Sequence, residues 1–443
     1  MTLASSPTDC ESTGFQRRDP PRKVVPTRLL FLSQFCPMPA NNGTKIRTWA
    51  LLRALAAEGH EITLLTFADP REVNGHFAAV EQICRHVEWL PHALKSLSSS
   101  KDYLGRFTHL FSRLPYGVRG ARSIMMEQRI RALLQDQKID AIVCEQTDLL
   151  VNLPAGLLVP LVVDHHDLQH VILRRYLKFE RNPVKRLYAW GESRKVRAWE
   201  QLACQRAAIA IACSEHDRAL LAKLCPALPI AVVPNVVDTG AYVVNGETDG
   251  ELFRVLFQGA MDWYPNRDAV EFFVSAILPK LRALAPRIPV TVAGRNLPEN
   301  FRDRFTKASE VEFIGMVPDM GAEIARASVC IVPLRIGSGT RLKILEAAAM
   351  GKPIVSTRIG AEGLDFVDGE EIVLADEPWE FARAIADLLA NPARRRTMGL
   401  AARRRVETQY SLPALQSTLR EVLAQLMAMS SMEFTPASSE VRR

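Results

Sequence analysis

The sequence lacks the features that mark several large classes of protein. No apolar run in its 443 residues approaches the ~18 residues that a membrane-spanning helix needs. Residues 1–26 are polar and hold no apolar core of a secretory signal, so we interpret them as a disordered leader. The eight cysteines form no C-x-x-C pair and several stand inside apolar runs, which predicts buried thiols in a cytoplasmic protein without disulfides or a metal site.

Two common ligand-binding motifs are also missing. The absence of a G-x-x-x-x-G-K-[ST] loop excludes a P-loop nucleotide site. No two aspartates are spaced Asp-x-Asp, the arrangement with which many single-domain nucleotide-sugar enzymes hold a divalent cation. A nucleotide diphosphate would therefore have to be neutralised by cationic side chains and helix N-termini.

The composition is that of an ordinary globular protein, with 48% hydrophobic and 24% charged residues, which excludes disorder as the main state. The net charge of +7 is distributed unevenly: residues 1–240 carry +8 and residues 241–443 carry −1. This asymmetry indicates two domains with different partners.

Short apolar runs alternate with helical patterns along most of the chain. Arg28–Ser33, Thr44–Glu58 and Glu61–Phe67 read as a strand, a helix and a strand, and the same alternation restarts at Phe253–Gln258. The pattern predicts an α/β protein with two Rossmann-like, doubly wound domains that face each other across a cleft. We expect a leader, an N-terminal domain that includes a C-terminal helix, a second domain and a polar tail, at residues 1–26, 27–238 with 412–427, 239–411 and 428–443.

The segment with the most candidate ligand-binding residues is a loop of small residues between an apolar run and a helical pattern. Its backbone N–H groups and the helix N-terminus would form a phosphate cradle. Glu346, about 1.5 turns into the helix, could accept hydrogen bonds from vicinal sugar hydroxyls. The loop and the cations that follow it are Gly337, Ser338, Gly339, Thr340, Arg341 and Lys343. An ordinary strand-to-helix turn with solvated cations is the alternative reading.

Two further candidate features lie in the N-terminal half. The loop that contains Gly43 follows the first strand and could approach an anion by the same physics. His166 and Asp167 belong to a polar cluster, Asp164–His170, at the carboxyl end of an apolar run, where active sites of parallel sheets lie. Such Asp–His clusters can orient a leaving group, relay protons or bind a metal, but they also serve as capping and turn residues.

On these residues the chain resembles the retaining family-4 glycosyltransferases of the GT-B fold. The most specific resemblance lies in Arg341–Val355, supported by Phe257–Gly259, Val292–Gly294 and Gly360–Leu364. It implies an enzyme that moves a sugar, with hexosyl transfer most typical, from a UDP-, GDP- or ADP-sugar to an acceptor hydroxyl in polysaccharide or glycoconjugate assembly. No tightly bound cofactor is implied, and the enzyme would need little or no metal.

The resemblance also implies roles for single residues. Glu346 matches the glutamate that grips the ribose, Gly43 the glycine near the pyrophosphate, and His166, with Asp167 beside it, the histidine near the reacting sugar. The family's first motif glutamate is Ser338 here, and its usual diphosphate-binding Arg and Lys, near Gly259, are replaced by Ala260 and Pro265. Arg341 and Lys343 are the substitutes we expect, with Arg267 or Arg295 as alternatives.

These departures keep other functions open. A catalytically impaired GT-B binding or regulatory subunit would explain the lost cations. A metal-dependent phosphoesterase would use Asp164, His165 and His166 as ligands. A nucleotide-sugar 2-epimerase would share the fold.

A basic helical stretch, with aromatic residues between its charges, follows the Asp–His cluster. It reads as a solvated helix, or as a surface for anionic lipid headgroups at the inner face of the plasma membrane or for an acceptor glycan, lipid-linked sugar or small molecule. No recognition motif accompanies the charge, so we do not expect nucleic acid as a partner. The basic residues are Arg174, Arg175, Lys178, Arg181, Lys185, Arg186, Arg194, Lys195 and Arg197.

Overall fold

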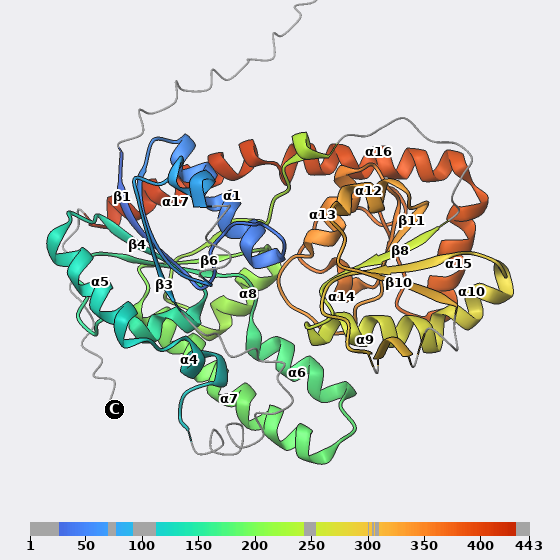
Figure 1. Ribbon diagram of the computed structural model, residues 1–443, viewed down its shortest axis with the longest axis horizontal. Coiled ribbons are helices and arrows are strands. Elements are labelled where there is room, and N and C mark those ends of the chain that lie inside the picture. The colour runs from blue at the N-terminus through green and yellow to red at the C-terminus, as the bar shows by residue number, and fades with distance from the viewer. Residues whose placement is uncertain are drawn as a thin grey trace, which may run out of the picture.

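The computed structural model describes residues 26–69, 77–91, 112–242, 254–299, 301–303, 305 and 310–430. Within them the chain builds two parallel β-sheets, each flanked by helices (Figure 1). This confirms the predicted fold class. The expected leader, except its last residue, and most of the expected break between the domains lie outside the described residues.

The N-terminal sheet has seven parallel strands in the order β3-β2-β1-β4-β5-β6-β7. Its central strands are buried on both faces, as their continuous apolar runs predict. The edge strand β3 was not predicted, because its side chains are largely half-buried or exposed and form no apolar run. The strands are β1 (Arg28–Ser33), β2 (Glu61–Ala68), β3 (His86–Pro91), β4 (Ala141–Glu145), β5 (Leu161–His165), β6 (Ile209–Ala212) and β7 (Ile230–Val232).

Alternate side chains of β1 enter two separate cores. Leu29 and Phe31 pack with α1 and α17 on one face, whereas Leu30 and Leu32 pack with α4, α5 and α7 on the other. The helical elements of this half are α1 (Gly43–Ala57), α4 (Tyr116–Ala121), α5 (Ile124–Asp136), the 3₁₀ turn η1 (Thr147–Asn152), α6 (Gln169–Phe179), α7 (Pro183–Arg206), α8 (Glu215–Leu224) and the 3₁₀ turn η2 (Thr239–Ala241).

The second sheet has six parallel strands in the order β10-β9-β8-β11-β12-β13. One continuous apolar cluster joins it to its helices. The strands are β8 (Val255–Gln258), β9 (Val290–Ala293), β10 (Val311–Gly315), β11 (Val329–Val332), β12 (Ile354–Ser356) and β13 (Val373–Leu374), and the helices are α9 (Tyr264–Phe272), α10 (Leu278–Leu284), α12 (Met320–Ala325), α13 (Leu342–Ala349), α14 (Arg358–Ala361), α15 (Pro378–Ala390) and α16 (Pro392–Gln409).

Two predicted helices differ in detail from the structure. The sequence pattern over Arg267–Leu284 predicts one helix, but the helical segment begins at Tyr264 and contains a π-helical turn, η3 (Phe273–Ile277), between α9 and α10. The last helix, α17 (Leu412–Ser430), runs past Met427 into the expected polar tail.

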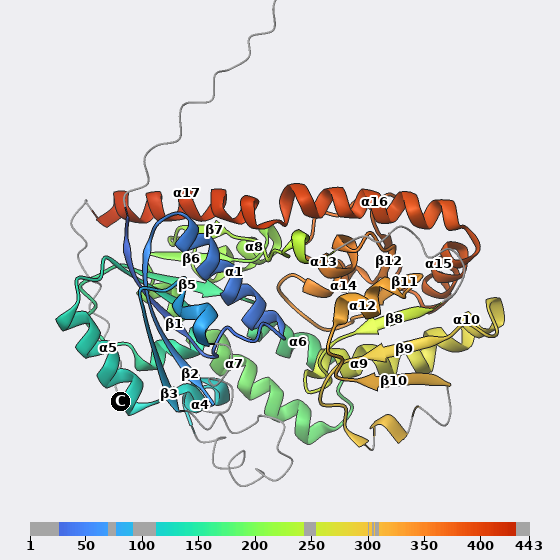
Figure 2. The ribbon, with the colours of Figure 1, turned by 45° about the horizontal axis from the view of Figure 1, so that its top comes forward.

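The long helices α16 and α17 lie end to end along both halves of the molecule (Figure 2). Leu415, Leu419 and Leu426 return α17 to the core of the N-terminal sheet. The apolar face of α17 thus packs in the same core as β1 and α1, which lie far earlier in the sequence. None of the described helices has the length and apolar character needed to cross a membrane.

Candidate functional site

Loops from the two sheets meet where the sequence predicts the cleft. The backbone N–H of Leu168, just after β5, donates to Ser338 Oγ at 3.1 Å. Gly339 has a φ of 72°, and a Cβ there would lie 2.5 Å from the carbonyl oxygen of His166. A glycine is therefore required both by the backbone conformation and by the close approach of the two loops. The structure thus brings His166 and Asp167 against the Gly337–Thr340 loop.

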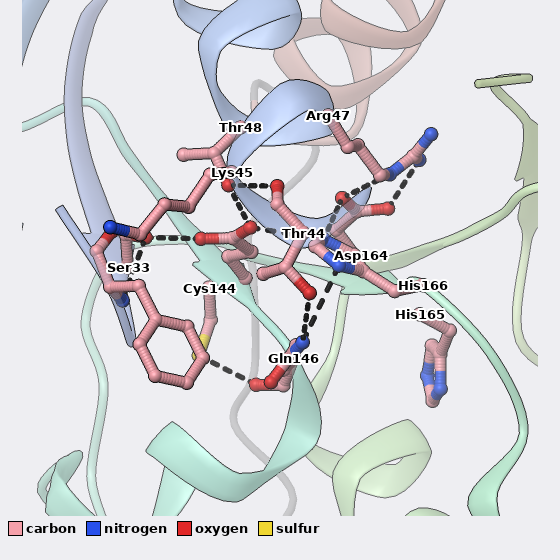
Figure 3. Close-up of polar contacts among 12 residues, drawn as sticks. Ser33, Thr44, Lys45, Arg47, Thr48, Cys144, Gln146, Asp164, His165 and His166 are labelled. Carbon is pink, nitrogen blue, oxygen red and sulfur yellow. Dashed lines mark hydrogen bonds and ion pairs between the residues drawn. The ribbon is translucent and has the colours of Figure 1, made fainter. Parts of the chain in front are cut away.

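The residues that the N-terminal sheet and its helices contribute to this site are called the N-terminal wall, and those from the second sheet and its helices the C-terminal wall. A buried ion pair lies within the N-terminal wall. Arg47, in the middle of α1, donates from Nη2 to Asp164 Oδ1 at 2.6 Å and from Nε to Oδ2 at 2.9 Å (Figure 3). Its Nη1 donates to Asn235 Oδ1 at 2.9 Å and to the Val233 carbonyl at 3.0 Å. Both side chains are almost wholly buried. Arg47 keeps the pKa of Asp164 far below its usual range, although burial alone would raise it.

His166 lies between two buried carboxylates. Its Nε2 is 3.2 Å from Asp164 Oδ2 and 3.2 Å from Glu145 Oε1. Burial favours the neutral ring, but the two carboxylates outweigh it and raise the pKa of His166 to about 9. Glu145 in turn accepts hydrogen bonds from Ser33 and Thr48. His166 is therefore held as an imidazolium at neutral pH.

Asp167 lies beside His166 but has no cationic partner of its own. It accepts a hydrogen bond from Gln169 Nε2 at 2.7 Å, and burial raises its pKa to about 6. Its Cβ lies 3.3 Å from the position that a Cβ of Gly339 would take. Asp167 thus faces the loop of the second sheet.

Two glycines bring backbone close together on the C-terminal wall. A Cβ on Gly294 would lie 1.8 Å from the Gly259 carbonyl oxygen, and one on Gly259 would lie 2.8 Å from Lys343 Nζ. Lys343 donates to Asn266 Oδ1 at 2.8 Å and lies over the ring of Phe257. Burial and the nearby Arg341 guanidinium lower its pKa to about 7, although Glu346 acts in the opposite direction. Lys343 thus lies beside the glycine that normally precedes the family's diphosphate-binding arginine.

Glu346 follows Lys343 by three residues and shares its face of α13. Its Oε2 accepts from Gln258 Nε2 at 3.0 Å and its Oε1 accepts from the Tyr242 hydroxyl at 3.3 Å. Burial raises the pKa of Glu346 to about 7. The two hydrogen-bond donors to Glu346 are thus neutral groups.

Arg341 turns back toward its own loop. Its Nη1 donates to the carbonyls of Ser338 and Gly339, while its buried Nη2 has no hydrogen-bond partner. Burial lowers the pKa of Arg341 from its ordinary value. Arg341 occupies the N-cap of α13, which begins at Leu342 rather than at Arg341 as the sequence pattern suggested.

Further side chains tie the two walls together. Asp217 Oδ1 accepts from Ser338 Oγ at 3.1 Å and from the Gly339 N–H at 3.4 Å. Arg175 of α6 forms a bidentate pair with Glu362, at 2.6 and 2.8 Å, and also donates to the Gly337 carbonyl. Gly43, at the start of α1, lies against Leu342 of the other half. A neighbour from the opposite wall thus lies beside each predicted loop glycine: Leu342 at Gly43, Arg175 at Gly337 and His166 at Gly339.

Several buried polar atoms at this junction have no hydrogen-bond partner in the structure. They come from both walls and are His166 Nε2, Gln258 Oε1, Arg295 Nε, Thr340 Oγ1 and Arg341 Nη2. His166 Nε2 nevertheless keeps its two ionic contacts. Buried polar groups are normally hydrogen-bonded, so these atoms keep unused hydrogen-bonding capacity.

Sequence reasoning missed several residues of the site. Arg47 looks like a surface residue of an amphipathic helix, and its partner lies 117 positions away. Glu145 and Gln146 follow the apolar run of β4, so their place at a carboxyl end beside β5 was a usable signal. Asp217, Tyr242 and Asn266 gave no such signal. Arg267 caps its own loop by donating to the Met261 and Asp262 carbonyls.

Comparison with known proteins supports the glycosyltransferase class that the sequence resemblance implies. The model for Glycosyltransferase Family 4 matches residues 41–241, and the model for Glycosyl transferases group 1 matches residues 253–391. An uncharacterised 44.6 kDa protein in the cps region of Klebsiella pneumoniae is 23% identical in an alignment of 377 residues that covers 82% of this chain and 91% of that protein.

Solved structures share the architecture. Sucrose-phosphate synthase from Thermosynechococcus elongatus has a TM-score of 0.69 and 19% identity, covering 91% of this chain and all of that one. Anabaena HepE in complex with UDP and glucose has a TM-score of 0.63 and 15% identity, covering 90% of this chain and all of that one.

The two parallel sheets with flanking helices have the GT-B architecture of these solved structures. With both halves matched by glycosyltransferase models, the chain belongs to the family-4 glycosyltransferases.

Proposed function

We propose that the protein transfers a sugar from a nucleotide diphosphate sugar to an acceptor hydroxyl with retention of anomeric configuration, in polysaccharide or glycoconjugate assembly, without a bound metal. The observation that carries this proposal is the group of unpartnered buried polar atoms at the junction of the walls. Arg295, Thr340 and Arg341 offer N–H or O–H donors there. An anionic diphosphate and a sugar would supply the missing acceptors.

The two walls suggest how the donor is bound. Lys343, beside Gly259, would meet the diphosphate, and the ligand's negative charge would stabilise its ammonium. Glu346 would accept from the ribose hydroxyls. The backbone of the Gly337–Thr340 loop and the N-terminus of α13 would then face the phosphates, as the sequence predicts. A UDP-, GDP- or ADP-sugar meets these requirements equally.

The state of His166 limits its part in the chemistry. Because two carboxylates keep the ring protonated, His166 donates hydrogen bonds and does not act as a general base. The proton of the acceptor hydroxyl would therefore pass to the leaving phosphate as the new glycosidic bond forms on the same face of the sugar. Lys343 and the helix N-terminus would stabilise the charge on the departing diphosphate.

The surroundings of Asp164 disfavour the phosphoesterase alternative. Arg47 binds both of its oxygens, where a metallo-phosphoesterase would present them to metal ions. Within the part of the chain that the structure describes, no group of three or more His, Cys, Asp or Glu side chains could hold a metal ion.

A ligand screen with variants tests the function. Thermal unfolding in UDP, GDP, ADP and their sugars is expected to show a raised Tm with one nucleotide and its sugar, because a ligand that binds only the folded state stabilises it. Release or transfer of the sugar should follow, and Glu346→Ala should abolish both effects, whereas the distant Lys280→Met should keep them. Binding without turnover against a panel of acceptors would favour the impaired-subunit alternative.

We also propose that α7 docks on an anionic membrane surface, such as the inner face of the plasma membrane. Its N-terminal half exposes three large apolar side chains, Val184 at 74%, Leu187 at 69% and Trp190 at 51%. Exposed cations, Lys185, Arg186 and Arg194, lie among them, and Arg194 stacks over the Trp190 ring. Apolar and basic groups on one helix match acyl chains and anionic headgroups.

Vesicle co-sedimentation tests this surface. The full chain is expected to sediment with vesicles that contain anionic lipid and to remain free of neutral ones. Leu187→Asp with Trp190→Asp should abolish the binding without lowering the Tm, because both side chains are exposed. Equal binding to both kinds of vesicle, or to neither, would contradict the proposal.

A further inference from the structure

Gln146 has a backbone conformation that is normally restricted to glycine. Its φ is 64° and its ψ is 145°, a combination in which a side chain collides with its own backbone. Among the described residues, the other non-glycine positions with positive φ are Asn296 and Glu310, and both are exposed. Gln146 is half-buried and follows β4 directly in the N-terminal wall.

Neighbouring groups hold this conformation. The Gln146 N–H donates to the Asp164 carbonyl at 3.0 Å, and its own carbonyl accepts from Cys144 Sγ at 3.6 Å. The turn η1 begins at the next residue. A glycine at position 146 would adopt this backbone conformation without strain. The backbone strain therefore arises from the side chain of Gln146.

The side chain points into the site. Its Nε2 lies 3.4 Å from His166 Nδ1 and 3.5 Å from Thr44 Oγ1, between the end of β5 and the start of α1 (Figure 3). With Glu145 and Asp164 at Nε2, His166 also has a proton on Nδ1 to donate. A carboxamide turned by half a rotation fills the same volume and presents its oxygen to that proton, with its N–H₂ group on the other side.

We propose that Gln146 is a positioning residue for sugar transfer: its carboxamide fixes the plane of the His166 ring from the Nδ1 side and holds one N–H for a hydroxyl of the transferred sugar. This role rests on the proposed function. The backbone strain is the cost of aiming the carboxamide between Thr44 and His166. The carboxylates on Nε2 and the carboxamide on Nδ1 then define the ring orientation together.

Two substitutions separate the strain from the side chain. Gln146→Gly removes both, so its Tm is expected to equal or exceed that of the wild type while kcat falls at least tenfold. Gln146→Ala removes the carboxamide but keeps the strain, so it should lose as much activity with a lower Tm than Gln146→Gly. Glu310→Gly relieves a positive φ far from the site and should raise the Tm with unchanged activity.

The kinetic readout distinguishes positioning from mere support. A positioning role predicts that kcat falls while KM for the donor changes less than threefold, and that the pH profile of kcat shifts in both Gln146 variants. A Gln146→Gly variant with wild-type kcat and pH profile, or with a Tm below that of the wild type, would overturn the inference. If the wild type neither binds nor turns over any donor, the proposed function fails instead, and this role with it.

Discussion

The two walls of the site bury charged groups in opposite ways. In the Arg47–Asp164–His166 group of the N-terminal wall the charged forms are favoured: the pKa of His166 is raised to about 9 and that of Asp164 is lowered, whereas burial raises that of Asp167 beside them. On the C-terminal wall they are disfavoured: burial lowers the pKa of Lys343 and raises that of Glu346, each to about 7.

The difference lies in the partners. Asp164 has a guanidinium and His166 has two carboxylates, whereas Lys343 and Glu346 are held chiefly by amide, hydroxyl and aromatic groups. The Arg47–Asp164–His166 group of the N-terminal wall therefore has its charges compensated before a ligand arrives. The C-terminal wall needs a ligand with negative charge and hydroxyl groups, as a nucleotide diphosphate has, to favour its charged forms.

Removing the guanidinium should break the N-terminal wall and have the largest effect on stability. Arg47→Met leaves Asp164 buried beside His166 without its strongest partner, a loss of about 3–5 kcal/mol in the free energy of unfolding. Urea denaturation measures it. Arg53→Met is the matched control, because Arg53 lies on the same helix and pairs with Asp238 at the surface, where such pairs contribute about 0–1 kcal/mol. Similar small losses in both variants would mean that the N-terminal wall is not preorganised by this pair.

Removing the Lys343 ammonium from the C-terminal wall should affect ligand binding instead of folding. Lys343→Met is expected to lower kcat/KM by about 10²–10³-fold, the usual effect of losing a cation or donor at a developing negative charge. Because its pKa is lowered in the fold, the folded state binds fewer protons than the unfolded chain from about pH 7 to 10.5, so the ammonium destabilises the ligand-free protein. The variant should thus be as stable as the wild type or more so.

Lys280→Met, far from the site on α10, serves as the control and should change neither quantity. A Lys343→Met variant that loses stability but still binds nucleotide as the wild type does would reverse the contrast between the walls.

The sequence predicted the C-terminal wall better than the N-terminal one. Lys343 and Glu346 are three residues apart on one helix, so local spacing places them together, and the loop glycines Gly337 and Gly339 directly precede that helix. The N-terminal wall instead combines residues from α1, β4 and β5. A lone arginine in a helix and a lone glutamate after a strand do not indicate such long-range pairing.

The fold was likewise predicted best where the signal is local in the sequence. Central strands of a parallel sheet are apolar on both faces and stand out in the sequence. The edge strand β3 has no such run and was missed. What depends on local pattern could be predicted, whereas what depends on tertiary burial, including the pKa of His166, could not.

The charge on His166 should appear as a pH-dependent stability. A pKa raised from 6.5 to about 9 stabilises the fold fully below pH 6.5, and this contribution is lost as the pH rises through 9. Relative to His166→Gln, the wild type should lose roughly 2–3 kcal/mol of unfolding free energy between pH 6 and pH 10. His60 provides a control of opposite sign, since burial lowers its pKa and its neutral form is favoured. A difference between wild type and His166→Gln that stays flat over this range would show that the ring is neutral.

The smallest effect is expected where the two walls are joined. Arg175 and Glu362 are each less than one-fifth exposed and pair across the junction, yet both keep contact with water. A double-mutant cycle of Arg175→Met and Glu362→Gln should give a coupling energy of about 1 kcal/mol in urea denaturation, larger than that of the exposed pair Arg218–Glu215 within α8. Because the pair joins the walls without a hydrogen bond to any unpartnered atom of the site, loss of the pair should raise KM for the donor a few-fold and leave kcat nearly unchanged. A large fall in kcat would instead mean that the preorganised N-terminal wall depends on its contact with the other half, so that the two walls are not independent.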